Sequence, residues 1–143
     1  MTVKAILSNK GSDVVTVEPT CTLAHAIAVL SKYNIGALVV LGAEQRVIGI
    51  LSEREIVHAL AERGAAALDE PLSQAMTRGV ATCSESDKIS EIMELMTTGK
   101  FRHVPVVDLD KLAGIVSIGD VVKLRLSEME RDTEALRDYI QTA

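Results

Sequence analysis

The chain of 143 residues is 48% apolar and 24% charged, which is typical of a compact protein whose core needs no metal ion or disulfide to hold it. Its net charge of −5 and aromatic content of 2% exclude the basic surfaces and stacking faces on which nucleic-acid binding depends. Apolar runs too short for a membrane span or a signal peptide, and two isolated cysteines (Cys21 and Cys83), lead us to expect a cytoplasmic protein that binds no membrane.

In the first half of the chain the spacing of apolar residues changes in a fixed order, from that of a strand to that of a helix and back. Short runs of β-branched residues, or of residues that are apolar on both faces of a strand, predict strands. Apolar residues spaced by three and four predict helices. Pro19 closes the first strand and Gly64 stops the last helix. The predicted elements are a strand at residues 14–17, a helix at 22–33, a buried strand at 37–41, a strand at 47–51 and a helix at 53–63.

The second half repeats this order. At an offset of 66, Val14 matches Val80 and Val40 matches Val106; the offset then drops to 65 within a turn, so that Gly49 matches Gly114. The elements predicted there are a strand at residues 80–83, a helix at 88–98, strands at 104–107 and 112–116, and a helix from residue 118. The chain therefore contains two divergent copies of one unit.

Each unit is β-α-β-β-α, and this order limits how it can pack. A small sheet with two helices on one face leaves its other face open, so we expect the two units to pack sheet to sheet with pseudo-twofold symmetry in an α+β fold. We place the first repeat at residues 1–66, the second at 67–126 and a helical extension at 127–143.

Both copies carry Gly-Ile-x-Ser-x-x-acid between a strand and a helix, with Ser52 and Glu55 in the first and Ser117 and Asp120 in the second. One interpretation is a capping box, in which both side chains satisfy free backbone N–H groups. The other is a ligand site, in which the helix N-terminus attracts phosphate and the carboxylate accepts both hydroxyls of a ribose. Hydrogen bonds to a charged group contribute roughly 1.5–3 kcal/mol, so such a site would select against 2′-deoxy sugars.

A cationic cluster distinguishes the second copy from the first. It consists of Lys100, Arg102 and His103, just before the middle strand of that copy. The cluster forms either surface ion pairs or a phosphate contact. If it serves phosphate, we expect the better nucleotide site to combine it with Asp120, and a weaker site at Glu55, where Arg54 partly compensates. The first copy also has three extra residues around Lys10, which either cover a ligand or form a plain surface connection.

Two β-α-β-β-α repeats that each end in this motif resemble a tandem pair of CBS domains, a Bateman module. The resemblance extends from about residue 3 to residue 126, leaves no room for a catalytic domain, and is strongest to stand-alone bacterial CBS pairs, through runs at residues 49–57 and 101–108. It implies a non-enzymatic signalling module without an obligatory cofactor. In that family the cleft between the repeats binds AMP, ADP, ATP, S-adenosylmethionine or NAD(H), and ligand binding acts on a regulated protein, here not identified.

The resemblance also implies roles for particular residues. Asp120 would hold the ribose hydroxyls, with Ser117 on ribose or phosphate. Arg102 and His103 would face the phosphates. The adenine would be bordered by Thr16 and Thr82 and walled by Val104 and Pro105. The remaining expected site residues are Ala37, Ser52, Arg54, Glu55 and Lys100. Glu55 is one methylene longer than the aspartate usual in the family, which puts its site in doubt. No catalytic or metal-binding residue is expected.

The C-terminal segment carries an apolar stripe on a charged helix, formed by Leu126, Met129, Thr133, Leu136 and Ile140. The stripe either folds back on its own domain or joins a dimer contact. CBS pairs usually form dimers, and we favour a homodimer in which this helix packs on its mate. The alternative function is a ligand-free interaction module in which both serine–acid pairs are only helix caps.

Overall fold

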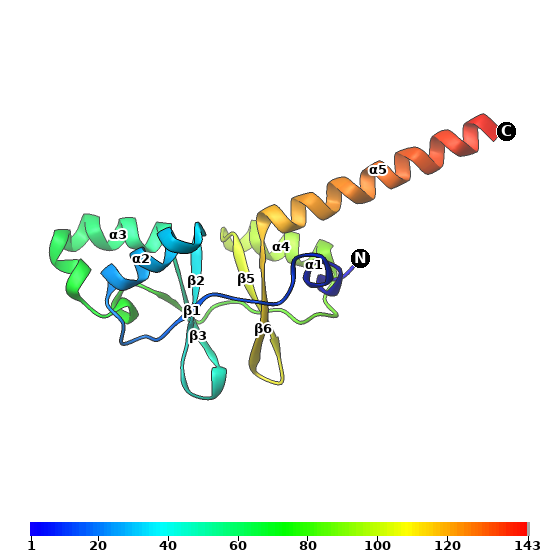
Figure 1. Ribbon diagram of the computed structural model, residues 1–143. Coiled ribbons are helices and arrows are strands. Elements are labelled where there is room, and N and C mark those ends of the chain that lie inside the picture. Colours follow the sequence, from blue (N-terminus) through cyan, green and yellow to red (C-terminus); the bar gives the residue numbers. More distant parts are fainter. Residues whose placement is uncertain (143) are drawn as a thin grey trace.

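The computed structural model describes residues 1–142 and places the two repeats side by side, with the last helix projecting from the second (Figure 1). The helices are α1 (Val3–Lys10), α2 (Leu23–Tyr33), α3 (Glu53–Arg63), α4 (Ile89–Gly99) and α5 (Ile118–Thr142). The strands are β1 (Thr16–Val17), β2 (Ala37–Leu41), β3 (Val47–Ser52), β4 (Thr77–Arg78), β5 (His103–Asp108) and β6 (Lys111–Ser117). Short 3-10 turns are η1 (Ala43–Gln45), η2 (Gly64–Asp69) and η3 (Leu72–Gln74).

The predicted helices and most of the predicted strands are confirmed. Helix α3 has the predicted bounds, and α2 and α4 each begin one residue later than predicted. Thr22 caps α2, because its hydroxyl accepts a hydrogen bond from the backbone N–H of His25 (3.1 Å). Helix α1 and strand β4 are additional elements that the sequence pattern did not predict.

The strand predicted at residues 80–83 is wrong except at its last residue. In the first repeat β1 runs parallel to β2, within a sheet ordered β1-β2-β3-β4. In the second repeat only Cys83 takes that place, as an isolated parallel bridge to Val106 beside the hairpin of β5 and β6. Residues 80–82 form no strand, and Val80 and Ala81 instead line a cleft.

Two separate hydrophobic cores lie between the sheets and the helices, and each takes residues from the opposite repeat. We call residues 3–10 and 72–79 the leading segments, since each lies near the start of one repeat, before its first strand position. The first leading segment packs into the core of the second repeat through Val3, Ile6 and Leu7. The second packs into the core of the first repeat through Leu72 and Met76. The repeats are thus interlocked by exchanged segments.

This exchange explains the glycine of the shared motif. A Cβ atom on Gly114 would lie 2.8 Å from Leu7 Cδ2, and one on Gly49 would lie 2.7 Å from the Sδ atom of Met76. A side chain at either position would collide with the exchanged segment. Glycine therefore lets each leading segment lie directly on the last strand of the other repeat's hairpin.

The sheet faces opposite the helices are also buried. Ala37, Val39 and Ile50 are at most 7% exposed, yet they belong to neither helix-facing core. On the second hairpin Pro105 is buried and pairs with Ile115, on the same alternate face. These faces cover one another, which confirms the predicted sheet-to-sheet packing. Among residues 1–142 there is no helix with the length and apolarity needed to cross a membrane.

Candidate functional site

A cleft of about 890 Å³ opens between the two repeats. Its size is within the range of about 300–1,000 Å³ that is common for small-molecule sites. The start of α3, the end of α4 and the residues that follow β4 form its walls. The lining residues are Gly36, Ile50, Ser52, Glu53, Arg54, Glu55, Thr77, Gly79, Val80, Ala81, Gly99, Lys100, Phe101, Arg102 and His103.

Glu55 is held at the N-terminus of α3 by a capping box with Ser52. The Oε2 atom of Glu55 accepts from the backbone N–H of Ser52 (2.8 Å) and from its hydroxyl. The Oε1 atom accepts from the hydroxyl of Thr77 (2.8 Å), a residue that the sequence analysis did not select. Burial raises the pKa of Glu55, but the hydrogen bonds from Ser52 and Thr77 outweigh it and bring the pKa below its ordinary value. Glu55 is therefore an ionised acceptor in the wall of the cleft.

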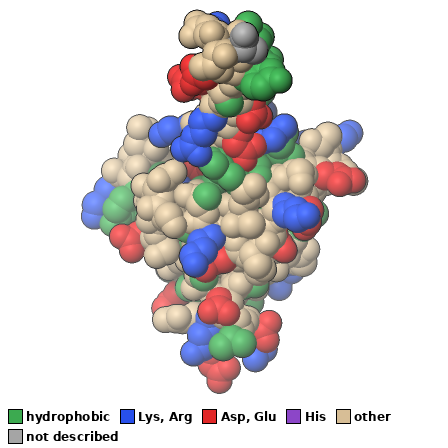
Figure 2. Space-filling view, turned by 90° about the vertical axis from the view of Figure 1, so that its right-hand side faces the viewer, with side chains coloured by type: hydrophobic (Ala, Val, Ile, Leu, Met, Phe, Trp, Pro, Cys, Tyr) green, Lys and Arg blue, Asp and Glu red, His purple; other side chains and the backbone are tan. Residues whose placement is uncertain are grey.

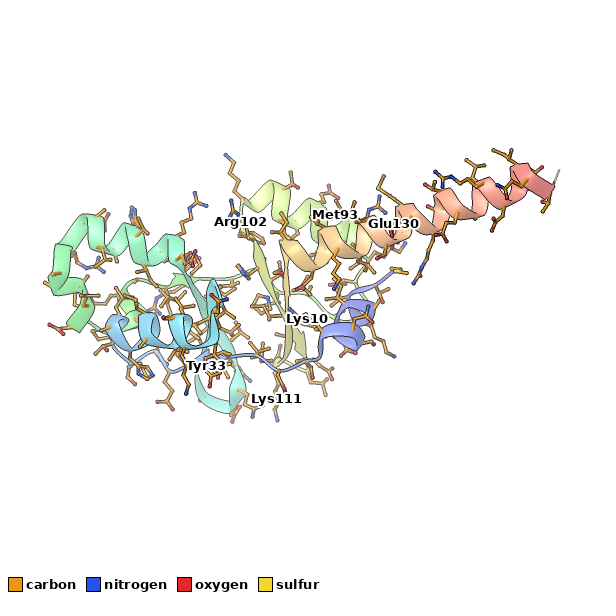
Figure 3. The ribbon with its side chains drawn as sticks, turned by 45° about the horizontal axis from the view of Figure 1, so that its top comes forward. Lys10, Tyr33, Met93, Arg102, Lys111 and Glu130 are labelled. Atoms are coloured by element: carbon orange, nitrogen blue, oxygen red, sulfur yellow. The ribbon has the colours of Figure 1, made fainter. Side chains whose placement is uncertain are left out.

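The cationic cluster lies across the cleft from α3. Arg54 donates from Nη1 to the backbone carbonyl of Lys100 (3.2 Å) and so connects the two repeats. Arg54, Lys100 and Arg102 bring three permanent positive charges to the lining, against the carboxylates of Glu53 and Glu55. Figure 3 shows Arg102 at the junction between α3 and α4. In a chain of net charge −5, this cleft is a local concentration of positive charge.

Backbone geometry sets the position of this cluster. Lys100 ends α4 in the left-handed conformation (φ 57°), as Asn34 ends α2 (φ 52°). The backbone N–H of Ile118 then donates to the carbonyl of Arg102 (2.8 Å), and that of Glu53 donates to the carbonyl of Gly36 (3.1 Å). Arg102 thus takes the place in the second repeat that Gly36 takes in the first, and only the second repeat carries charge there.

His103 is half-buried in the cleft wall. Burial lowers its pKa below the ordinary value, and the positive charges of Lys10 and Arg102 act in the same direction. The carboxylates of Asp120 and Glu55 raise the pKa, but by less. His103 is therefore neutral at pH 7 and lies within electrostatic range of the acids of both repeats.

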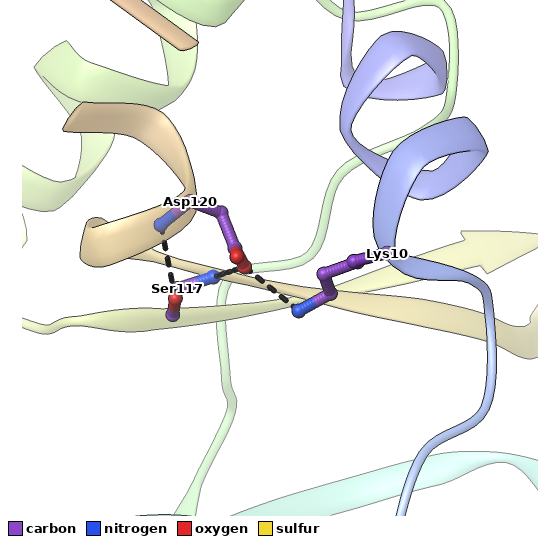
Figure 4. Close-up of polar contacts among 3 residues, drawn as sticks. All are labelled: Lys10, Ser117 and Asp120. Atoms are coloured by element: carbon purple, nitrogen blue, oxygen red, sulfur yellow. Dashed lines mark hydrogen bonds and ion pairs between the residues drawn. The ribbon is translucent and has the colours of Figure 1, made fainter. Parts of the chain in front are cut away.

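Asp120 and Ser117 lie outside the lining of the cleft, which differs from the expected pairing of Asp120 with the cationic cluster. They form their own cap: Ser117 donates its backbone N–H to Asp120 Oδ2 (2.9 Å), and Asp120 donates its backbone N–H to Ser117 Oγ (3.2 Å). Lys10 of the exchanged α1 donates from Nζ to Asp120 Oδ2 at 2.7 Å (Figure 4). Burial raises the pKa of Asp120, but Lys10 and Ser117 reverse this and lower it. The hollow beside Lys10 and Asp120 holds only about 160 Å³.

The residues expected to face the adenine do not share one surface, because neighbouring side chains of a strand point to opposite faces of the sheet. Val104 is fully buried in the helix-facing core, so it is not a wall of the cleft, whereas Pro105 lies on the other face of β5. Ala37 is buried between the sheets. Thr16 and Thr82 are exposed and lie outside the lining, where Val80 and Ala81 lie instead.

Sequence reasoning did not assign Lys10 and Thr77 as partners of the two acids. Lys10 and Thr77 belong to the two leading segments. Each segment thus supplies a hydrogen-bond donor to the acid of the opposite repeat. The one available signal was the matching of residues 3–8 with 72–77, together with the lysine in the extra loop. The partnership itself depends on the exchange of segments, which sequence matching alone does not specify.

Comparison with known proteins matches the family model of the CBS domain to residues 3–62 and 72–127. The crystal structure of the CBS-domain containing protein ATU1752 from Agrobacterium tumefaciens has a TM-score of 0.84 and 48% identity, covering 87% of this chain and 99% of that one. An uncharacterized 17.7 kDa protein of Acidianus ambivalens is 36% identical over 114 residues, which is 79% of this chain and 68% of that protein. The CBS domain pair of protein MJ0100, solved in complex with 5′-methylthioadenosine and S-adenosyl-L-methionine, has a TM-score of 0.79 and 27% identity, covering 90% and 98% of the two chains.

Proposed function

Because this chain belongs to the CBS domain family and contains a pair of its domains, which form a regulatory module, we propose that it is a non-enzymatic sensor of an adenosine-containing ligand. The ligand is AMP, ADP, ATP, S-adenosylmethionine or NAD(H), bound in the cleft between the repeats. The observation that carries the proposal is this cleft of about 890 Å³, in which a helix N-terminus with an ionised carboxylate faces a cationic cluster.

The lining suits the three parts of a nucleotide. Ile50, Val80 and Ala81 offer an apolar surface to the base. The carboxylate of Glu55 accepts hydrogen bonds from the ribose hydroxyls, with Thr77 as the donor that they replace. The phosphates lie between the N-terminus of α3 and the cationic side chains of Arg54, Lys100 and Arg102, with the neutral imidazole of His103 beside them. The complex of the MJ0100 domain pair with two adenosyl compounds supports this choice of ligand class.

In this proposal the module works as a homodimer and transmits its ligand state to a regulated protein. A ligand that contacts both walls of the cleft favours one relative placement of the repeats, and it shifts the population by its difference in affinity for the two placements. The contact between Arg54 and the carbonyl of Lys100 connects those walls and changes with such a shift.

The test is thermal unfolding in the presence of AMP, ATP, NAD⁺, S-adenosylmethionine and, as a control for the base, GMP. A ligand at a hundred times its Kd stabilises the folded protein by about 2.7 kcal/mol, which raises the midpoint measurably. We expect a rise with adenosyl compounds that is lost in Arg102→Gln and reduced in Glu55→Gln. Arg46→Gln is the matched control, since Arg46 is exposed and lies outside the lining. Loss of the rise in Asp120→Asn alone would move the site to the second repeat.

A second candidate is a ligand-free interaction module. The observation in its favour is that both acids already have hydrogen-bond partners, Glu55 from Ser52 and Thr77, and Asp120 from Ser117 and Lys10. A panel in which no adenosyl compound at millimolar concentration moves the midpoint would support this candidate and exclude the sensor.

A further inference from the structure

His103 stands at a position that the fold itself fills with a smaller, apolar residue. It is the first residue of β5 and pairs with Ser117 at the end of β6. In the first repeat the equivalent pair is Ala37 with Ser52, and Ala37 is 7% exposed. Alanine therefore satisfies the packing at this register position, so the hairpin does not require the imidazole of His103. The ring lines the cleft, which indicates a role toward a ligand there.

The main chain on either side of His103 is held in place, and its ring is left open to the cleft. The carbonyl of Arg102 accepts a hydrogen bond from the backbone N–H of Ile118 (2.8 Å). Val104, the next residue, is fully buried in the core. Within residues 1–142 no hydrogen bond or ion pair uses the imidazole, and no buried side-chain nitrogen lacks a partner, so the ring nitrogens are accessible. A ligand group can therefore bond to the ring without breaking a contact of the fold.

The charged groups that act on His103 are two of each sign. Lys10 of α1 and Arg102 lower its pKa, whereas Asp120 of α5 and Glu55 of α3 raise it. Since these two pairs oppose each other, burial decides the outcome, and the ring is neutral at pH 7. The other charged groups that line the cleft are Glu53, Arg54 and Lys100.

A phosphate in the cleft adds a charge that these neighbours do not offset. Arg102 and His103 are consecutive and both line the cleft, so a phosphate bound by the guanidinium of Arg102 comes close to the imidazole. A phosphate monoester carries a charge of about −1.5 to −2 at pH 7. A negative charge within about 4–6 Å favours the protonated form of a histidine, whereas the permanent cations of the lining are the same before and after binding. On the side from which α5 projects, basic and acidic side chains are instead intermixed (Figure 2).

We propose that His103 takes up a proton when the phosphate of an adenosyl ligand enters the cleft, so that an imidazolium meets the bound phosphate. This inference rests on the proposed sensor function, and it adds that the module responds to pH together with its ligand. The proton comes from water or buffer, because the phosphate monoester is largely dianionic at pH 7 and has little to give. The competing arrangement is a neutral imidazole that only donates a hydrogen bond to the phosphate.

The coupling has a defined direction on the pH scale. The pKa of His103 lies below 6.5 in the protein alone and is higher in the complex, so the affinity falls as the pH rises through the value of the complex. The phosphate loses charge below its own second pKa of about 6, so the useful window is from about pH 6.5 to pH 8. Across it we expect the Kd for AMP to rise about threefold to tenfold, and the Kd for adenosine, which has no phosphate, to stay constant.

Titration calorimetry of the full chain with AMP and with ATP counts the protons. At pH 7, the binding heats in PIPES and in Tris, which differ in ionisation enthalpy, should differ by the amount that corresponds to about 0.5–1 proton taken up. His103→Gln should bind with equal heats in both buffers. His25→Gln, at an exposed histidine outside the lining, is the matched control and should keep the difference. Equal heats in the unsubstituted protein would overturn the proposal.

NMR of the histidine rings identifies the group that takes up the proton, without any substitution in the protein that is measured. The chain has three histidines, so three ring signals are followed, and the spectrum of His103→Gln assigns one of them. Saturation with AMP should raise the titration midpoint of His103 by about one pH unit or more. The midpoints of His25 and His58, which lie outside the lining, should not move. An unmoved His103 would contradict the proposal.

Failure of the coupling and failure of the sensor function give different results. Binding of AMP or ATP with no proton uptake refutes the coupling alone. Binding of S-adenosylmethionine, but of neither phosphate-bearing compound at millimolar concentration, also leaves the sensor standing and refutes the coupling, because no phosphate then enters the cleft. Binding of no adenosyl compound refutes both.

Discussion

Lys10 and Thr77 have equivalent roles in the two repeats, yet they leave the two acids in different states. Each belongs to a leading segment and donates to the acid of the opposite repeat, Thr77 to Glu55 and Lys10 to Asp120. The hydroxyl of Thr77 is neutral, so the negative charge of Glu55 is not balanced by its partner, whereas the ammonium group of Lys10 neutralises the charge of Asp120. The open cleft accordingly lies at Glu55, and a small hollow lies at Asp120.

Replacing Lys10 by methionine tests the ion pair while keeping the apolar stem. We expect the pKa of Asp120 to rise, as followed by NMR of its carboxyl carbon, and the free energy of unfolding at pH 7 to fall by about 0.5–1 kcal/mol for this part-exposed pair. Since the pKa of Asp120 is lowered on folding, this stabilisation is present above the ordinary value of 3.8 and is lost as the pH falls through the folded value. Lys4→Met, on the exposed side of the same helix, serves as the comparison; an equal loss of stability there would refute the assigned pair.

His103 makes stability depend on pH in a window of its own. Burial lowers its pKa below 6.5 in the folded protein, so the unfolded chain takes up a proton first as the pH falls. The contribution of neutral His103 to the free energy of unfolding is therefore fully present above about pH 7 and declines as the pH falls below 6.5. Neither Glu55 nor Asp120 interferes between pH 7 and 5, because their pKa values lie below 4.5 and 3.8. Urea unfolding across this window should show a slope that His103→Gln reduces; an unchanged slope would argue against a neutral His103.

At the scale of the elements, the sequence predicted those that repeat and missed those that cross between repeats. Apolar periodicity located the four longer helices and the two hairpins, because their own residues determine which face is buried. Helix α1 and strand β4 are short, and their positions depend on contacts with the opposite repeat. The two serine–acid pairs were found as caps, but the cleft contains only the first of them. Which acid faces the cationic cluster is a property of packing that no local pattern contains.

The two repeats also differ in how α2 and α4 begin. Thr22 caps α2 with its hydroxyl, whereas Lys88, at the matching position of α4, makes no side-chain cap. Both residues are exposed, and both have extended backbone conformations. We expect Lys88→Thr to raise the free energy of unfolding by about 0.5–1 kcal/mol. Chemical denaturation measures it, with Lys111→Thr on an exposed strand end as the comparison; no gain at position 88 would mean that the bond from the backbone N–H of Glu91 to the carbonyl of Lys88 (3.0 Å) already suffices.

At the scale of the whole molecule, the exchanged leading segments make the repeats interdependent. Leu7 is a residue of α1, but it lies in the core of the second repeat against Gly114. Leu7→Ala should therefore destabilise the protein by about 2–4 kcal/mol, a cost normally found in the middle of a domain. Hydrogen exchange should show the loss of protection in β5 and β6. Leu109→Ala, at a side chain that is 90% exposed, should have little effect; equal effects would mean that α1 is only peripheral.

The exchange also has a consequence for synthesis on the ribosome. Helix α1 is made well before the residues that it packs against, because every core residue that it joins outside its own segment is numbered 83 or higher. At about 5–20 residues per second, those partners follow several seconds later. During that interval the apolar side of α1 has no native surface to cover it, and the first repeat still lacks Leu72 and Met76. The nascent chain thus passes through a stage in which neither core is complete, and the second repeat, once made, completes both cores together.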